Sequence, residues 1–345
     1  MSVGIFHHND MDGYAAAAVV AASFGKKIAP PEETNIWFME CNYTNKNISA
    51  DRIDDECRYP PDEVYIVDLS MKSEEEFEEV YKILALTGVM RVVWIDHHQA
   101  SKDFYNNVLK KSERFQRAVE RNRLHAKIDM RYSGAWLTYS YCFKGNNGRP
   151  SAIRLVDDWD TWKHKFPESR SLNSAFYAEP FGTGLKDPNS IEWRKLIGGY
   201  LSIEDYNLLP HKTGYPSGRP IYCPKLPADH NLLKKYIERG KIINQYKQTT
   251  YDAYFRANGY VTEFEGYRTM VLNYKANSEV FSEFYDECPL HLIWVFDGVQ
   301  YKYSIYSETI DCNEIAKKYG GGGHKGAAGF TSNELLVPTG DKYFL

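Results

Sequence analysis

Short apolar segments alternate with helix-length segments through the first half of the chain, and this alternation restricts the fold more than any other feature. The candidate strands are Val3–His8, Asn35–Glu40, Val64–Asp68 and Val89–Ile95. Between them, Tyr14–Phe24 and Ser73–Leu86 have the length and pattern of helices. Strands separated by helices form βαβ units, which place the strands in parallel. The sequence therefore predicts an α/β fold with a doubly wound, mostly parallel sheet and helices on both faces.

The second half of the chain has a different pattern. Asn231–Phe255 carries apolar residues at helical spacing and no proline, so it predicts one long helix. After Gly259 short β-like runs return, and a helix over Cys312–Tyr319 follows them. A chain of 345 residues is also longer than most single cores support. We expect a first domain over residues 1–228 with an irregular part at 166–228, a linker helix at 229–257 and a smaller α/β domain at 258–345, with the functional site in the cleft between the domains.

Charge and cysteine content restrict the partners and the compartment. The formal net charge is −4, so the chain lacks the positive field that holds a long nucleic acid by its backbone. This favours a short or small phosphorylated substrate over a long duplex. The six cysteines are scattered without a CxxC pair, which is typical of reduced thiols. The sequence has no apolar run of about 18 residues and no signal-peptide pattern, so we expect a cytoplasmic protein that does not bind membranes.

Ionisable residues follow the first candidate strand. If the chain stays extended past this strand, alternation places His8, Asp10 and Asp12 on one side and His7 on the other. Gly13 would permit the turn into the next helix. An imidazole and two carboxylates on one side suit a metal ion. The alternative is a set of turn residues with a capping aspartate.

Three further segments carry residues of the same kind. One apolar strand leads into Asp68, and the next leads into the consecutive Asp96, His97 and His98. Each residue alone has a structural alternative, since an aspartate can cap a turn and a histidine can be held by hydrogen bonds. A later segment contains three carboxylates, of which we expect one to complete the site and the others to cap or orient: Asp157, Asp158 and Asp160. Strand ends that meet at one edge of a sheet favour a single site.

These four segments, in this order, resemble the DHH phosphoesterase family, which includes RecJ-type exonucleases and short-RNA oligoribonucleases. The resemblance covers roughly residues 1–165 and 255–335. It implies one ion held by His8, Asp10 and Asp68, and a second held by Asp12, Asp68, His97 and Asp158. Asp68 would be catalytic as the ligand shared by both ions.

Two assignments within this resemblance depend on single positions. The family's fourth aspartate follows a hydrophobic residue and one spacer, which selects Asp158, although Asp157 competes for the place. His98 resembles the family's catalytic histidine on the substrate side and not a metal ligand.

The segment Gly320–Gly329 holds a run of four glycines followed by His324 and Lys325. Backbone N–H groups of such a run can close around an anion, and His324 adds a side-chain donor. The spacing is not that of a phosphate-binding Walker loop, and the remaining alternative is a flexible linker. The segment resembles the glycine-rich signature of the DHH-associated domain. This implies substrate binding by Gly322, Gly323, His324, Lys325 and also by Tyr306, which stands where the family often has an arginine.

Together these features predict a phosphodiesterase that uses two divalent cations and a hydroxide bridging them. Carboxylate and imidazole ligands without thiolate suit Mn²⁺, with Mg²⁺, Zn²⁺ or Co²⁺ as alternatives. The expected substrate is a short single-stranded RNA, released as nucleoside monophosphates. Alternatives are a cyclic or linear dinucleotide, a 3′-phosphoadenosine-type monoester, or a nucleotide sensor without catalysis. The sequence leaves monomer and homodimer open.

Overall fold

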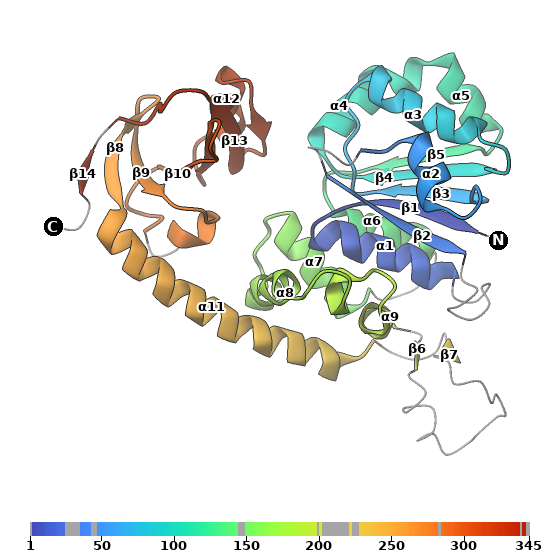
Figure 1. The fold of residues 1–345 in the computed structure, drawn as a ribbon, viewed down its shortest axis with the longest axis horizontal. Helices are drawn as coiled ribbons and strands as arrows, with labels where there is room; N and C mark the ends of the chain where they lie inside the picture. Colours follow the sequence, from blue (N-terminus) through green and yellow to red (C-terminus); the bar gives the residue numbers. More distant parts are fainter. Residues whose placement is uncertain are drawn as a thin grey trace. The chain divides into compact units, whose positions relative to one another are not determined.

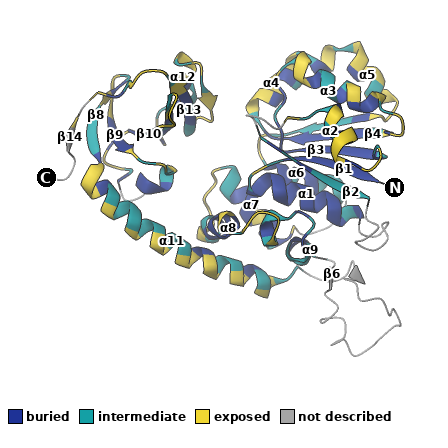
Figure 2. Ribbon diagram, viewed as in Figure 1, coloured by how far each residue is buried: buried dark blue, intermediate teal, exposed yellow. Residues whose placement is uncertain are grey.

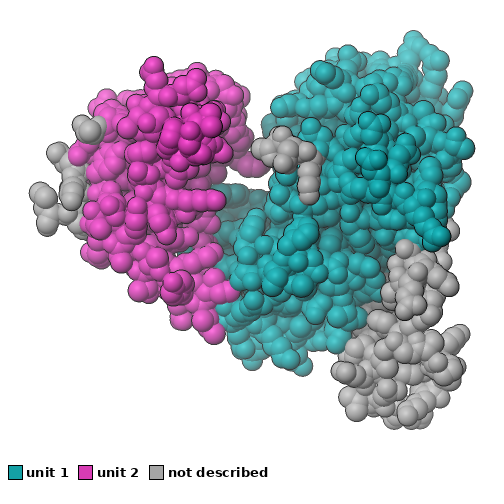
Figure 3. Space-filling view, in the orientation of Figure 1, with its two compact units in different colours: residues 1–241 teal, residues 242–345 magenta. Residues whose placement is uncertain are grey.

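The computed structural model of the chain describes residues 2–24, 35–42, 47–143, 149–198, 200–201, 221–222, 228–281, 284–338 and 340–342. The chain divides into two compact units, residues 1–241 and 242–345 (Figure 3). Each unit has its own sheet and its own apolar core.

A five-stranded parallel sheet forms the centre of the first unit (Figure 1). Its strands lie in the order β2-β1-β3-β4-β5. Their bounds are β1 (Val3–His8), β2 (Ile36–Cys41), β3 (Glu63–Val67), β4 (Arg91–Asp96) and β5 (Leu124–Ile128). All four neighbouring pairs are parallel. This confirms the predicted α/β class and parallel sheet.

Helices cover both faces of this sheet, so the residues of its central strands are buried (Figure 2). Tyr65 and Val67 of β3 belong to one apolar cluster, whereas Val64 and Ile66 of the same strand belong to the other. The first face carries α1 (Met11–Phe24), α6 (Gly134–Cys142), α7 (Ser151–Asp160), α8 (Pro167–Tyr177) and α9 (Ile191–Ile197). The second carries α2 (Ala50–Glu56), α3 (Glu74–Ala85), α4 (Gln99–Asn107), η2 (Leu109–Lys111) and α5 (Glu113–Glu120).

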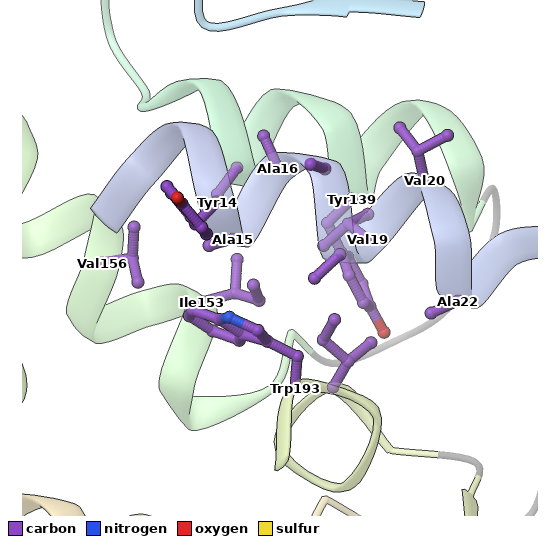
Figure 4. Close-up of a cluster of buried hydrophobic side chains, with 14 of the residues drawn as sticks. Tyr14, Ala15, Ala16, Val19, Val20, Ala22, Tyr139, Ile153, Val156 and Trp193 are labelled. Atoms are coloured by element: carbon purple, nitrogen blue, oxygen red, sulfur yellow. The ribbon is translucent and has the colours of Figure 1, made fainter. Parts of the chain in front are cut away.

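Helix α1 is buried along almost its whole length, since every residue from Met11 to Ala22 is buried. Its alanine-rich sequence has little side-chain volume, so neighbouring helices can pack closely around it. Figure 4 shows α1 with Tyr139 from α6, Ile153 and Val156 from α7 and Trp193 from α9. This packing fixes the helix that begins beside the ends of the strands.

The part of the chain expected to be irregular contains two packed helices. Leu172 and Phe176 of α8 and Trp193 of α9 are fully buried in the same cluster as α1. The 3-10 turn η3 (Gly184–Lys186) lies between them, and the short strands β6 (Tyr200–Leu201) and β7 (Ile221–Tyr222) pair further along. Residues 202–220 and 223–227 lie outside the described part. The sequence predicts a helical fragment at Ile191–Tyr200, which corresponds to α9, but the expectation of an irregular segment was wrong for α8, whose Leu172 and Phe176 form a buried helix face.

Helix α11 (His230–Asn258) contains the boundary between the two units. The second unit has a seven-stranded sheet in the order β12-β13-β11-β10-β9-β8-β14. Its strands are β8 (Tyr260–Phe264), β9 (Tyr267–Asn273), β10 (Leu290–Phe296), β11 (Tyr301–Tyr306), β12 (Gly322–Gly323), β13 (Ala327–Ser332) and β14 (Asp341–Lys342). The 3-10 turn η4 (Ser278–Phe281) and the helix α12 (Cys312–Lys318) complete it. Among the described residues, no helix has the length and apolar character needed to cross a membrane.

Candidate metal centre

The polar residues predicted for the site lie at the carboxyl ends of β1, β3 and β4. His8 is the last residue of β1, Asp68 follows β3 directly and His97 follows β4 directly. Strands β1 and β3 are neighbours, but the helices that follow them, α1 and α3, pack on opposite faces. Where the helices that follow two neighbouring strands pack on opposite faces, a crevice opens at the carboxyl ends of those strands, and ligands bind in such crevices. The topology therefore brings together residues that are up to about 90 positions apart in the sequence.

The chain does not stay extended after β1, so this part of the expectation was wrong. Helix α1 begins at Met11, and Asp12 lies in its first turn. Asp10 caps the helix, because its Oδ1 accepts the N–H of Gly13 at 2.9 Å and its carbonyl accepts the N–H of Tyr14 at 3.0 Å. A Cβ atom at Gly13 would lie 2.3 Å from the carbonyl oxygen of His8, so only glycine allows so tight a turn.

Asp68 is the centre of the cluster. Its Oδ1 lies 3.2 Å from Nε2 of His97, and its Oδ2 lies 3.9 Å from Nδ1 of His8. Nδ1 of His8 also lies 2.8 Å from Oδ2 of Asp10. The carboxylate of Asp68 therefore stands between two groups of potential ligands. The backbone of Asp68 has a φ of 56°, a left-handed conformation that aspartate adopts more readily than most residues.

The fourth carboxylate of the cluster is Asp160, not Asp158. Oδ2 of Asp160 lies 3.3 Å from Nε2 of His97, and Oδ2 of Asp12 lies 3.8 Å from the same atom. The carboxylate of Asp158 instead accepts the backbone N–H groups of Lys165 and Phe166, at 2.9 and 3.1 Å. Our selection of Asp158 by spacing is thus corrected, because its oxygens fix the turn after α7.

Asp157 has a different structural role. Its Oδ1 accepts the backbone N–H of Ser133 at 2.8 Å, and its Oδ2 pairs with Nζ of Lys163 at 2.6 Å. Ser133 is the N-cap of α6. Asp157 therefore holds the start of α6 in place and is not a member of the cluster.

The start of α6 binds Asp12, a contact that our sequence analysis missed. The N–H groups of Gly134 and Ala135 donate to the two oxygens of Asp12, at 2.6 and 2.9 Å. Anions are stabilised at helix N-termini by such groups. A Cβ atom at Gly134 would lie 2.8 Å from Cβ of Asp68, so the glycine is required for the helix to approach the cluster. The Ser133-Gly134 pair was the available signal in the sequence.

Four carboxylates and two imidazoles in so small a volume perturb one another. Burial raises the pKa of Asp68 and of Asp160 well above the usual range, and the neighbouring charges of Asp12 and Asp10 raise both further. Burial also raises the pKa of Asp12. For Asp10 the effect of burial is outweighed by His8, which lowers its pKa. Carboxylates this close cannot all carry full charge at neutral pH unless cations compensate them.

The histidines beside the cluster differ in environment. Nδ1 of His98 lies 2.7 Å from Oδ1 of the buried Asp96. Burial would lower the pKa of His98, but Asp96 raises it. His7 lies on the other side of β1, with its ring edge-on to Tyr14 at 4.8 Å, and burial lowers its pKa to about 4. His7 is a neutral core residue and His98 faces the cluster.

The donor set fits divalent metal ions. Both carboxylate oxygens of Asp68 and Oδ2 of Asp160 are buried and, among the described residues, have no hydrogen-bond partner. Buried polar atoms without partners are costly and rare in native proteins. Three groups of side chains could hold a cation: His8 with Asp10 and Asp68; Asp12 with His97 and Asp160; and Asp68 with His97 and His98. Carboxylate and imidazole ligands without sulfur suit Mn²⁺ or Mg²⁺.

The glycine-rich segment of the second unit forms a β-hairpin, in which several backbone N–H groups are bonded within the protein. The N–H groups of Gly321 and His324 donate to the carbonyls of Ala316 and Ala327, at 2.9 and 2.7 Å. The N–H of Gly323 donates to Oδ1 of Asn313 at 3.1 Å. The expected cradle of free N–H groups is thus corrected. A Cβ atom at Gly321 would lie 2.2 Å from a carbonyl oxygen of β13, which explains a glycine there by close strand packing.

The predicted substrate-binding residues of this unit have unequal exposure. Gly322, Gly323, His324 and Lys325 are exposed on the hairpin. Tyr306, at the end of β11, is half-buried against the apolar cluster of this unit, and burial raises its pKa. The hairpin is accessible to a ligand, whereas Tyr306 offers only part of its ring.

Comparison with known proteins gives distant structural similarity only. No protein-family model matches the chain, and no curated protein matches it. The solved structures with a similar fold include PggH, a pGpG-specific phosphodiesterase from Vibrio cholerae, with 13% identity and a TM-score of 0.46 over 96% of this chain and 94% of that chain. Exonuclease RecJ bound to manganese has 13% identity and a TM-score of 0.47, with 96% and 86% covered.

A third similar structure is an exopolyphosphatase-related protein from Bacteroides fragilis, with 13% identity and a TM-score of 0.42 over 97% of this chain and 87% of that chain. Similarity at this level assigns no activity to the chain.

Proposed function

We propose that this protein is a phosphodiesterase that depends on two divalent cations, with short single-stranded RNA as its substrate and nucleoside monophosphates as its products. The observation that carries the proposal is the pair of buried carboxylate oxygens of Asp68, which have no hydrogen-bond partner in the described part of the chain and lie between His8 on one side and His97 on the other. The resemblance of the sequence to the DHH family supports the same reaction class.

The cluster divides naturally into two sets of ligands that share Asp68. His8, Asp10 and Asp68 would hold one ion, and Asp12, Asp68, His97 and Asp160 the other. Two cations held by these residues would supply a water of lowered pKa and neutralise charge on the phosphoryl oxygens. We propose Mn²⁺ as the native ion, with Mg²⁺, Zn²⁺ or Co²⁺ as substitutes.

The residues around the cluster position the reacting groups. Asp96 holds Nδ1 of His98, so it fixes the orientation of that imidazole. We assign to His98 the donation of a hydrogen bond or proton to the phosphoryl or leaving oxygen. Asp12 is held by the N–H groups at the start of α6, which keeps its carboxylate in place without substrate.

A short substrate agrees with the charge of the chain. The net charge of −4 gives no general attraction for a long nucleic acid. We propose that the exposed hairpin residues Gly322, Gly323, His324 and Lys325, together with Tyr306, bind the substrate. We also propose a cytoplasmic location, which the scattered cysteines without a CxxC pair favour.

The direct test is hydrolysis of a substrate panel. Purified protein with Mn²⁺ would be incubated with di- to decanucleotides of RNA and DNA, cyclic dinucleotides, pyrophosphate and a 3′-phosphoadenosine compound, and the products resolved by chromatography. We expect nucleoside monophosphates from the shortest RNA substrates and none after chelation of the metal. Failure to hydrolyse any phosphodiester, with Mn²⁺ bound to the protein, would contradict the proposal.

A further inference from the structure

The turn that follows Asp160 has an unusual residue at its critical position. The N–H of Trp162 donates to the carbonyl of Trp159 at 3.1 Å, and the N–H of Lys163 donates to the carbonyl of Asp158 at 3.0 Å. These two bonds form a Schellman motif, which ends a helix with one residue in the left-handed conformation. That residue is Trp162, with a φ of 54°. Glycine is common at this position because it has no Cβ, so a tryptophan there costs free energy.

The turn is held by contacts on several sides. The carboxylate of Asp158 accepts the N–H groups of Lys165 and Phe166, and Asp157 pairs with Lys163. His164, which follows, also has a left-handed backbone with a φ of 46°. Unfavourable backbone conformations that the surroundings maintain occur often at functional sites.

Three rings of the turn contact one another. The ring of His164 packs against the indoles of both Trp159 and Trp162, with centroids 5.2 Å from each and tilts of 34° and 39° between the planes. Trp159 packs against the apolar core around α1, whereas Trp162 is 45% exposed. The ring contacts therefore link the core to the exposed indole of Trp162, which is two residues after Asp160 in the sequence.

We propose that the exposed indole of Trp162, supported by His164 and Trp159, is a platform for a nucleobase of the substrate in the turn that follows Asp160. An exposed indole held in place by rings behind it offers a flat face at low entropic cost, and bases stack on such faces with little sequence preference. The inference rests on the proposed function. It gives a binding role to Trp162, whose left-handed backbone and exposed indole are not needed to hold a metal ion.

The test compares the binding of AMP with that of ribose 5-phosphate, which lacks the base. Both would be titrated by calorimetry against the full-length protein in Mn²⁺. The variants are Trp162→Gly, which suits the left-handed turn, and Trp162→Phe, which restores a ring. The control is Tyr59→Ala, since Tyr59 is an exposed aromatic of the same unit that packs edge-on against Trp37 of β2.

We expect the wild-type protein to prefer AMP over ribose 5-phosphate. Trp162→Gly should weaken AMP binding by about five- to a hundredfold, as expected for the loss of one stacked base, and leave ribose 5-phosphate binding unchanged. Trp162→Phe should retain most of the preference, and Tyr59→Ala all of it.

An AMP preference that survives in Trp162→Gly, or that is absent from the wild-type protein, would overturn the platform. Neither result would contradict the proposed function, because Mn²⁺ binding and phosphodiester hydrolysis are measured separately. Conversely, a protein that binds no Mn²⁺ and hydrolyses no phosphodiester would fail the proposed function, whatever its preference for AMP.

Discussion

The carboxylate cluster of the first unit and the glycine-rich hairpin of the second differ in how far their polar groups are hydrogen-bonded. In the cluster, both oxygens of Asp68 are buried and lack hydrogen-bond partners among the described residues. In the hairpin, the N–H groups of Gly321, Gly323 and His324 all donate to other groups of the protein. The Asp68 oxygens are therefore available to a ligand, whereas these three N–H groups of the hairpin are already bonded.

This difference separates chemistry from binding. Removal of a cluster residue should affect the reaction itself, while removal of a hairpin side chain should affect only the capture of substrate.

The largest effect is expected for Asp68→Asn. Asparagine tolerates the left-handed backbone at this position, so the fold should persist while the charge is lost. We expect kcat with Mn²⁺ to fall by more than about a hundredfold, since metal catalysis contributes several kcal/mol and each 1.36 kcal/mol is about tenfold in rate. The control is Asp54→Asn, at an exposed carboxylate of α2, which should leave kcat unchanged. Retention of more than about a hundredth of wild-type kcat in Asp68→Asn would remove this residue from the mechanism.

Asp160 and Asp158 provide a matched pair within α7. Asp160→Asn should lower kcat by more than about a hundredfold and weaken Mn²⁺ binding, because Asp160 lies beside His97. Asp158→Asn should retain kcat within about tenfold but lower the free energy of unfolding by about 1–3 kcal/mol, because its oxygens accept two backbone N–H groups. Activity assays and denaturant titrations of both variants would decide the assignment. The reverse ranking would restore Asp158 as the ligand.

A smaller effect is expected for His324→Ala in the exposed hairpin. Loss of a charge-assisted contact to substrate should raise KM for nucleotide substrates by about tenfold, with kcat and Mn²⁺ binding unchanged. Steady-state kinetics would be compared with those for bis-p-nitrophenyl phosphate, which lacks the nucleoside groups of the proposed substrate. Equal damage to both substrates, or loss of Mn²⁺, would place His324 in the metal centre or the fold.

The smallest effect is a shift in thermal stability with metal and pH. Burial and neighbouring charges raise the folded-state pKa of Asp68 and Asp160 above the ordinary value of 3.8, so their contribution to the stability of the metal-free protein is lost as pH rises through the raised pKa values. Mn²⁺ binds the deprotonated carboxylates. We therefore expect the increase in Tm on adding Mn²⁺ to be larger at pH 8 than at pH 5.5. At about a hundredfold excess over Kd the gain is about 2.7 kcal/mol, or roughly 5 °C.

Melting curves with Mn²⁺ and with EDTA at both pH values would measure this shift. The control is Asp68→Asn, which should lose most of the response to Mn²⁺. An increase in Tm that is independent of pH, or that is larger at pH 5.5, would contradict the assignment of these carboxylates as metal ligands.

The sequence by itself determined the parallel sheet and the meeting of His8, Asp68 and His97. Alternating apolar strands and helices specify parallel strands, and the carboxyl ends of parallel strands lie at one edge of a sheet. The strand and helix patterns are local, so they are readable without tertiary information. The cluster residues at these strand ends were predicted for the same reason.

The tertiary structure decided which carboxylate of α7 joins the cluster and what the glycine run does. Consecutive helical residues point about 100° apart, so Asp158 cannot point where Asp157 or Asp160 points, and the spacing of a motif does not show which face is turned inward. Asp158 accepts a backbone N–H of the turn after α7, and Asp157 accepts the backbone N–H of the N-cap residue of α6. Likewise, a glycine run shows that backbones approach closely, but whether its N–H groups are free depends on the neighbouring strand. Both outcomes depend on contacts between distant segments, and a single sequence does not encode them as a local pattern.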